Sequence, residues 1–419
     1  MAHIRRLLKN KNFFFLWFGQ IISQLGDRLG QMALIGFVSL NIRGSSIEIA
    51  KALFFTILPV FLIGPLAGVY VDRWDRRKTL YMCDFLRAIL VMIIPLFLIH
   101  TNTKLPVYLL IFLIFSIGRF FIPAKLAIVP DLVERQDLLL ANSLINTTGM
   151  IAAILGFGLG GVLVEWCGPK GGFYLDSLSF FISALFIFFI RQKKLDYTFK
   201  IKEVASEIVN LVKKSVLEEI KEGFVYFFKN KHIRFTAWIM FILWSALGSI
   251  YVVLIVFIQE TLSSITRDLG FLITSVGCGL FLGSLLYGRF GQKLPPYRSI
   301  FLSLILSGLF LAFFSLSLSF HPNFFIALIL TFILGIVISP IMITSYTLIH
   351  KVSQDYMMGK IFSSLEMVMH FAFILFMFIS SFLAHYITTE LYILLGVSIV
   401  FVILGFMNLI YHRKILWLR

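Results

Sequence analysis

Long apolar segments alternate with short polar or charged connections along the whole chain. Each segment has about 20 residues or more, which is the length that a helix needs to cross a hydrocarbon layer of ~30 Å. Phe-rich runs such as residues 179–190 (SFFISALFIFFI) favour lipid-facing helices over the alternating pattern of a membrane barrel. We therefore expect an all-α polytopic membrane protein with twelve spans, at residues 13–40, 48–71, 79–99, 106–124, 139–165, 172–190, 235–258, 268–288, 299–319, 323–349, 359–385 and 390–411.

One long connection divides these spans into two groups of six. It covers residues 191–234, where apolar residues recur at helical intervals among Lys and Glu. This pattern predicts amphipathic helices at the membrane interface, either as a resting linker or as a partner-binding segment. We expect an N-terminal six-helix bundle over 1–190, the linker over 191–234 and a C-terminal six-helix bundle over 235–419.

Composition and charge support this interpretation. Of the 419 residues, 59% are hydrophobic and 14% are charged, and the mean hydropathy is +0.94, which excludes a water-soluble globule. The net charge is +16, and 29 of the 37 Lys and Arg residues fall in alternate connections, on the side that holds both termini. This bias predicts that both termini lie in the cytoplasm. Basic residues that are divided among connections beside membrane spans also argue against nucleic-acid binding.

Several other function classes lack their sequence signals. The basic N-terminus leads into an apolar stretch without a cleavage site, so we expect a retained first helix rather than a signal peptide. The three Cys residues are far apart and predict neither disulfides nor a metal site. Nucleotide-binding, zinc-protease and hydrolase motifs are absent from the sequence, so we expect neither an enzyme nor a bound cofactor.

The connection after the second span carries a recognisable motif. The sequence GVYVDRWDRRKTL at residues 68–80 resembles the cytoplasmic loop signature of the major facilitator superfamily, and a weaker echo, GRFGQK, follows the eighth span. The resemblance implies the major facilitator fold and a cytoplasmic charge latch that joins the two halves. The matching residues are Gly68, Asp72, Arg73, Arg76 and Arg77.

A second resemblance indicates one branch of this superfamily. The sequences PAKLAIVPDLV, LLLANSL and AAILGFGLGGVLVEW, within residues 121–166, look like the drug exporter branch that includes macrolide efflux proteins and the enterobactin exporter. They are also similar to lysophospholipid transporters. The resemblance implies proton antiport of a small amphipathic compound of drug or siderophore type, by a monomer with alternating access. The alternatives are a lysophospholipid transporter and a membrane receptor or assembly factor that does not transport.

The first span carries a polar stripe. Four residues fall within an arc of about 60° on one helix face, and Arg28 stands at its margin; the four are Gln20, Gln24, Asp27 and Gln31. Because lipid does not accept such a face, we expect it to line a central cavity where Asp27 contributes to proton coupling or contacts a cation. The alternative is a permanent ion pair between Asp27 and Arg28, or an Arg on another helix.

Further ionisable residues lie inside the predicted spans. Asp84 and Arg87 are one turn apart, and we expect them to pair and to extend the latch. For Arg119 in the fourth span, the family resemblance implies a part in proton movement, and the alternative is a buried salt bridge. Glu366 and His370 share one helix face, which suits either a proton relay or a structural hydrogen-bonded pair.

The fifth span is rich in glycine. Small residues allow helices to approach each other closely in a membrane. We expect this role for Gly156, Gly160 and Gly161.

Overall fold

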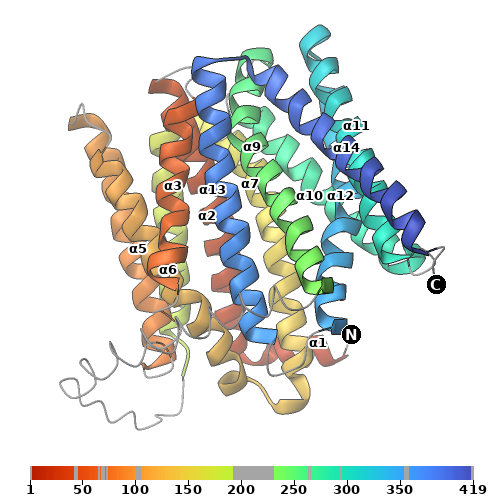
Figure 1. Cartoon of the computed structure of the whole chain (residues 1–419). Helices are drawn as coiled ribbons and strands as arrows, with labels where there is room; N and C mark the ends of the chain where they lie inside the picture. Colours follow the sequence, from red (N-terminus) through yellow and green to blue (C-terminus); the bar gives the residue numbers. More distant parts are fainter. Residues whose placement is uncertain are drawn as a thin grey trace. The chain divides into compact units, whose positions relative to one another are not determined.

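The computed structural model of the chain consists of helices joined by short connections (Figure 1). It describes residues 2–41, 46–64, 67, 71, 74–100, 105–191, 231–262, 264, 266–291, 295–352 and 358–416. The helices are α1 (Ala2–Lys9), α2 (Lys11–Asn41), α3 (Ser46–Leu62), α5 (Arg76–His100), α6 (Leu105–Leu132), η1 (Arg135–Asp137), α7 (Leu138–Phe188), α9 (Lys231–Thr261), α10 (Arg267–Phe290), α11 (Pro296–Phe320), α12 (Phe324–Val352), α13 (Met358–Tyr386) and α14 (Glu390–Leu416).

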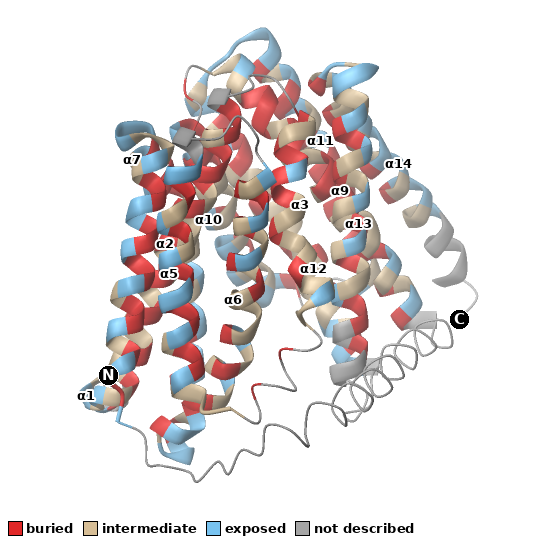
Figure 2. Ribbon diagram, turned by 90° about the vertical axis from the view of Figure 1, so that its left-hand side faces the viewer, coloured by how far each residue is buried: buried red, intermediate tan, exposed pale blue. Residues whose placement is uncertain are grey.

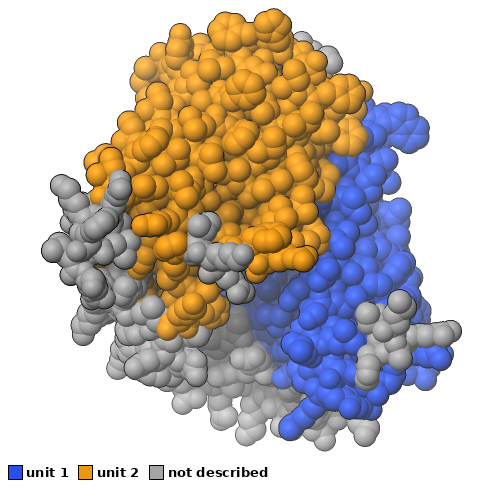
Figure 3. Space-filling view, turned by 90° about the vertical axis from the view of Figure 1, so that its right-hand side faces the viewer, with its two compact units in different colours: residues 1–41, 51–216 blue, residues 42–50, 217–419 orange. Residues whose placement is uncertain are grey.

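The chain forms two compact units (Figure 3). The N-terminal unit comprises Met1–Asn41 and Lys51–Val216, and the C-terminal unit comprises Ile42–Ala50 and Leu217–Arg419. The predicted bundle boundaries at residues 190 and 235 stay predictions. Most of the predicted amphipathic linker, residues 192–230, lies outside the described part of the chain.

Membrane-spanning helices dominate both units. Within the described residues, nine helical segments are long and apolar enough to cross a membrane. The longest, α7, consists of two helices that meet at Gly168, whose φ of 72° belongs to the left-handed region that glycine adopts without strain. Pro169 follows and begins the second helix. The predicted number of twelve spans stays a prediction.

Many large apolar side chains are exposed on these helices (Figure 2). Examples in the N-terminal unit are Leu109 and Phe181, and examples in the C-terminal unit are Phe313, Phe325 and Ile399. A water-soluble protein rarely exposes such continuous apolar surface. In a membrane protein the same surface faces lipid, which is as apolar as the side chains themselves.

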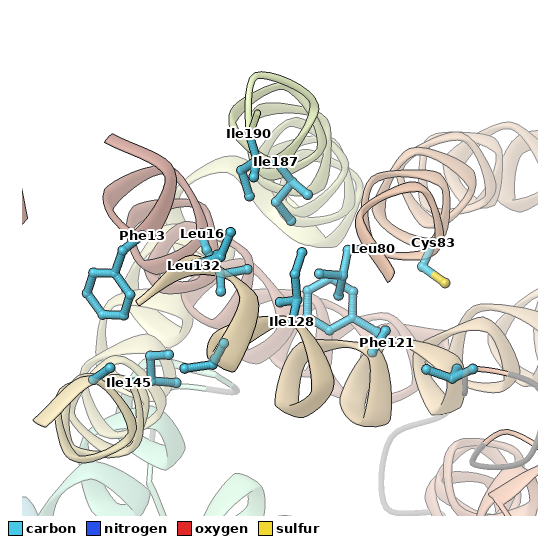
Figure 4. Close-up of a cluster of buried hydrophobic side chains, with 14 of the residues drawn as sticks. Phe13, Leu16, Leu80, Cys83, Phe121, Ile128, Leu132, Ile145, Ile187 and Ile190 are labelled. Atoms are coloured by element: carbon cyan, nitrogen blue, oxygen red, sulfur yellow. The ribbon is translucent and has the colours of Figure 1, made fainter. Parts of the chain in front are cut away.

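The N-terminal unit has an apolar core near one end of its helices (Figure 4). Phe13 and Leu16 of α2 lie there with Leu80 of α5, Ile128 of α6 and Ile187 of α7. The cluster draws four helices together close to the starts of α2 and α5 and the ends of α6 and α7. It therefore fixes the positions of the polar residues that follow farther along α2 and α5.

The C-terminal unit has a core of its own. Its members include Met240 of α9, Phe301 of α11, Ile341 of α12, Leu365 of α13 and Phe401 of α14, all buried. In a membrane, close packing of side chains stabilises such a core, because burial from lipid supplies no hydrophobic driving force. Each unit thus has its own packed interior.

Candidate functional site

Arg87 is the centre of a charged cluster inside the N-terminal unit. It lies about three turns into α5 and is buried. Its Nη2 donates a hydrogen bond to Asp27 Oδ1 of α2, and its Nη1 lies 3.7 Å from Asp84 Oδ1 of its own helix. The guanidinium also covers the ring of Phe180, 3.9 Å from the ring centroid, in a cation–π contact. Arg87 therefore neutralises carboxylates from two helices.

Asp84 is fully buried, and its carboxyl group contacts a residue of α7 as well as Arg87. Ser183 of α7 donates a hydrogen bond from its hydroxyl to Asp84 Oδ2 at 2.6 Å. Because a buried carboxylate without donors is costly, Ser183 and Arg87 together make this position tolerable. The predicted pairing of Asp84 with Arg87 is thus present, although the hydrogen bond of Arg87 goes to Asp27.

Asp176 is a third carboxyl group in the cluster, and the sequence analysis missed it. It lies on the second helix of α7 and is 5% exposed. Arg87 interacts electrostatically with it as well as with Asp27 and Asp84. The signal in the sequence was a single Asp inside the otherwise apolar span 172–190. We refer to Asp27, Asp84, Arg87 and Asp176 as the Arg87 cluster.

Two glycines of α2 make room for Asp176. A methyl group on Gly30 would overlap Asp176 Oδ2, and one on Gly26 would lie 2.9 Å from Asp176 Oδ1. The carboxyl group thus packs directly against the backbone of α2. The two glycines stand one turn apart on the same face, and α7 contacts α2 along this groove.

A small cavity adjoins the cluster. Its volume is about 30 Å³, and Asp27, Gly30, Gln31 and Asp176 are among the residues that line it. Most of the remaining lining is apolar, so Asp27, Gln31 and Asp176 supply its polar groups. Asp27 is less buried than its partner, since its side chain is 30% exposed. Asp27 is therefore the more accessible member of the ion pair.

The side chains of the predicted polar stripe on α2 contact two different helices, α5 and α7. Asp27 faces Arg87, whereas Gln24 and Arg28 lie against the first helix of α7, next to Gly149 and Gly156. Arg28 donates to Gln31 Oε1 at 3.1 Å and covers the ring of Phe157. Gln20 is buried. The ion pair of Asp27 is thus formed with an Arg on another helix, and the role of the stripe in a central passage stays a prediction.

The glycines predicted to pack helices lie against α2. A methyl group on Gly156 would come within 2.9 Å of Arg28 Cβ, and one on Gly160 within 2.9 Å of Leu29 Cα. Gly161 is buried in the same helix. The first helix of α7 therefore approaches the backbone of α2 closely beside the Arg87 cluster.

Two of the predicted latch residues bind helix ends within the N-terminal unit. Arg76 donates to the Ala127 carbonyl and to Asp131 Oδ2, both at 2.9 Å, and Arg77 donates to the Phe188 carbonyl. The other three, Gly68, Asp72 and Arg73, lie outside the described residues. The latch between the halves stays a prediction.

Arg119 lies on α6, close to the cluster. It is half-buried, and its neighbour Gly118 faces Arg87, since a methyl group there would lie 3.7 Å from Arg87 Cζ. Lys125 of α6 interacts electrostatically with Asp27. The helix therefore brings positive charge to the same region. Whether Arg119 moves protons stays a prediction.

Glu366 and His370 belong to the C-terminal unit. His370 Nδ1 lies 2.9 Å from the backbone carbonyl oxygen of Glu366, and the imidazole packs beside the ring of Trp244. The Glu366 residue is exposed. The proton relay predicted for this pair stays a prediction.

The Arg87 cluster consists of three carboxyl groups and one guanidinium group. Within the described residues, no group of three His, Cys, Asp or Glu side chains is placed to hold a metal ion. Carboxyl groups that share one arginine can exchange that partner when one of them binds a proton, because protonation removes the charge that the arginine neutralises.

Comparisons with known proteins agree with this description. The family model described as transmembrane secretion effector matches residues 6–357. Macrolide efflux protein A of Streptococcus pyogenes is 24% identical over 86% of this chain and 86% of its own. The putative bacilysin exporter BacE of Bacillus subtilis is 25% identical over 85% of this chain and 84% of its own.

Solved structures support the fold. The crystal structure of the nucleoside transporter NupG superposes with a TM-score of 0.73 at 14% identity, over 95% of this chain and 98% of that one. Similarity at this identity concerns the fold alone. These comparisons do not show the similarity to lysophospholipid transporters that the sequence suggested.

Proposed function

Because the chain belongs to the transmembrane secretion effector family of the major facilitator superfamily, and is therefore a membrane transporter rather than an enzyme, we propose that it exports an amphipathic organic compound in exchange for protons. The names of two relatives, a macrolide efflux protein and a putative bacilysin exporter, support export of a drug-like compound. A siderophore-like compound rests on the resemblance seen in the sequence alone. Membership of a transporter family argues against the receptor or assembly factor that the sequence left open.

The ion pair between Asp27 and Arg87 is the observation that carries the antiport proposal. A charged pair inside a membrane span is expensive, and such residues usually serve the transport pathway. The pair joins α2 to α5, and Asp27 borders the cavity. Binding of a proton to Asp27 removes its charge and leaves Arg87 with Asp84 and Asp176. The contact between α2 and α5 therefore depends on protonation.

This dependence supplies a coupling mechanism. Transporters of this type expose the site to one side of the membrane at a time as their parts move. A ligand shifts such an equilibrium only when it binds one conformation better than the other. The proton binds better where the Asp27–Arg87 contact is broken, so protonation and conformation are linked.

The surroundings of the transporter follow from sequence and family. We propose a monomer in the bacterial inner membrane, with both termini in the cytoplasm, as the distribution of basic residues favours. Protons, lipid and a small amphipathic compound are its partners. Energy comes from the proton gradient.

Accumulation of labelled compounds in cells tests the proposal. Cells that express the protein should hold less of a radiolabelled macrolide or a lipophilic dye than cells with an empty vector, and a protonophore should abolish the difference. Asp27→Asn should abolish it too, because an amide neither binds nor releases a proton in this range. Asp268→Asn, which changes a buried carboxylate of the C-terminal unit, is the matched control. Export that continues with Asp27→Asn, or after the gradient is collapsed, contradicts proton antiport.

A further inference from the structure

Asp176 differs from the other carboxyl groups of the Arg87 cluster in its hydrogen bonding. Asp27 accepts from Arg87, and Asp84 accepts from Ser183. Among the described residues, Asp176 Oδ1 and Asp84 Oδ1 are both buried without a hydrogen-bond donor, but Asp84 has the bond from Ser183 on its other oxygen. The nearby Ser179 hydroxyl donates to the backbone carbonyl of Asp176 at 2.7 Å. An ionised carboxylate placed against a helix backbone in this way is strongly unfavourable.

The charges around Asp176 come from three helices. Arg28 on α2 is directed to Gln31 and Phe157 and not to the cluster. Asp84, Arg87 and the Cys83 thiol lie on α5, and Lys125 on α6 interacts with Asp27. Arg87 interacts with all three carboxyl groups, and α6 also brings the half-buried Arg119 near the cluster. Arg87 by itself cannot neutralise three ionised carboxylates.

The site has room for proton movement. Asp27 and Asp176 line the same cavity of about 30 Å³, a volume that can hold one water molecule. The two carboxyl groups therefore border one common space.

We propose that Asp176 holds a proton while Arg87 is paired with Asp27, and that this proton passes to Asp27 across the cavity. In the transfer, the O–H bond of Asp176 breaks and an O–H bond forms on Asp27. Asp176 becomes the carboxylate that Arg87 neutralises together with Asp84, so the total charge of the cluster is unchanged. The assignment of a bound proton to Asp176 follows from the geometry of the cluster. The use of this proton in export rests on the proposed function.

Infrared spectroscopy of the purified full-length protein in lipid tests whether Asp176 holds a proton. The wild-type protein should show the C=O stretch of a protonated carboxyl group at neutral pH, and Asp176→Asn should lose this band. Asp268→Asn should retain it, because Asp268 is equally buried at 5% exposure but is paired with Arg267 at 3.2 Å. A band of equal intensity in wild type and Asp176→Asn overturns the proposal.

A second variant tests the link to Arg87. In Asp27→Asn, Arg87 loses its hydrogen-bonded carboxylate and becomes available to Asp176, so the band should titrate away at lower pH than in wild type. An unchanged titration overturns the proposed exchange of partners. Asp176→Asn should also fold normally, because an amide has the shape of the protonated acid and carries no charge. Failure of this variant to fold contradicts a neutral Asp176.

Transport assays separate this inference from the proposed function. In proteoliposomes, Asp176→Asn should keep exchange of labelled macrolide across the membrane without a pH gradient and lose the part that the gradient drives. If the wild-type protein itself shows no gradient-driven transport, proton antiport fails, while the infrared band still decides whether Asp176 is protonated. Gradient-driven transport at the wild-type rate in Asp176→Asn overturns its part in coupling.

Discussion

The two units of the protein bury charge in different places. In the N-terminal unit, Asp84, Arg87 and Asp176 are buried within long spans. In the described part of the C-terminal unit, the two buried carboxylates, Asp268 and Glu390, stand in the first turns of α10 and α14. The positive end of the helix dipole stabilises carboxylates in that position. The C-terminal pattern therefore has a structural explanation, whereas the N-terminal cluster points to function.

Packing in the C-terminal unit depends on close contact between backbones. Gly248 of α9 lies against the backbone of Phe373 in α13, and Gly308 of α11 lies against the Ser398 carbonyl of α14. Such contacts let helices approach closely without a polar connection. We infer that this unit contributes shape and apolar surface to transport, while the N-terminal unit contributes the protonation chemistry.

Removal of Arg87 should have the largest effect on stability. Arg87→Met leaves Asp84 buried without its cation, and breaking a buried pair in this way costs about 3–5 kcal/mol. Arg267→Met is the matched change in the C-terminal unit, and its cost should be about 1 kcal/mol or less because that side chain is half-exposed. Thermal unfolding of both variants in detergent measures the difference. Equal losses of stability in the two variants would show that the ion pairs of the two units contribute equally to stability.

Two buried serines offer a second comparison. Ser183→Ala removes a hydrogen bond to the buried carboxylate of Asp84 and should cost about 1.5–3 kcal/mol. Ser315→Ala in α11 removes a bond to the Leu311 carbonyl of its own helix and should be nearly neutral. Thermal unfolding in detergent measures the loss of stability in both variants. A Ser183→Ala variant that is as stable as the wild type would contradict the supporting role of Ser183.

Glycine substitution tests the C-terminal side of the comparison. Gly248→Ala places a methyl group onto the backbone of Phe373, so it should destabilise the protein by about 1–3 kcal/mol. Gly396→Ala is the control, because a methyl group there meets nothing within 4 Å. It should be neutral or stabilising by up to about 1 kcal/mol. If Gly248→Ala is as stable as the control, backbone contact does not hold α9 to α13.

The smallest effect should come from an ion pair that joins an exposed arginine to the buried Asp137. Arg6 of α1 donates to both carboxylate oxygens of Asp137 at 2.6 Å, and this hydrogen bond raises the pKa of Arg6. Because Arg6 is exposed, water and salt screen the pair. Arg6→Gln should leave unfolding temperature and export unchanged at physiological salt. A clear loss of export would extend the functional region to α1.

Part of this picture could be predicted from the sequence. An Asp inside the first span had to face away from lipid, and the one-turn spacing of Asp84 and Arg87 predicted their contact. Spacing along one helix says nothing about neighbours on another helix, so the bond from Arg87 to Asp27 required the structure. The contact of Asp84 with Ser183 of α7 was hidden for the same reason.

Asp176 could have been found, because it is a charged residue in an apolar span. It stands in the stretch FYLDSLSFF, where a single charged side chain is costly unless it is paired. Its fit against Gly26 and Gly30 was not predictable, since the pairing of α2 with the second helix of α7 depends on the kink at Gly168.

Proton movement in proteoliposomes tests the central claim most directly. A pH-sensitive dye in the lumen reports protons that cross the membrane when a gradient of the exported compound is imposed. The wild-type protein should move protons against the flow of that compound. Asp27→Asn should pass the compound without protons, and Asp268→Asn should behave as wild type. Equal proton movement by wild type and Asp27→Asn would contradict the assignment of coupling to the N-terminal unit.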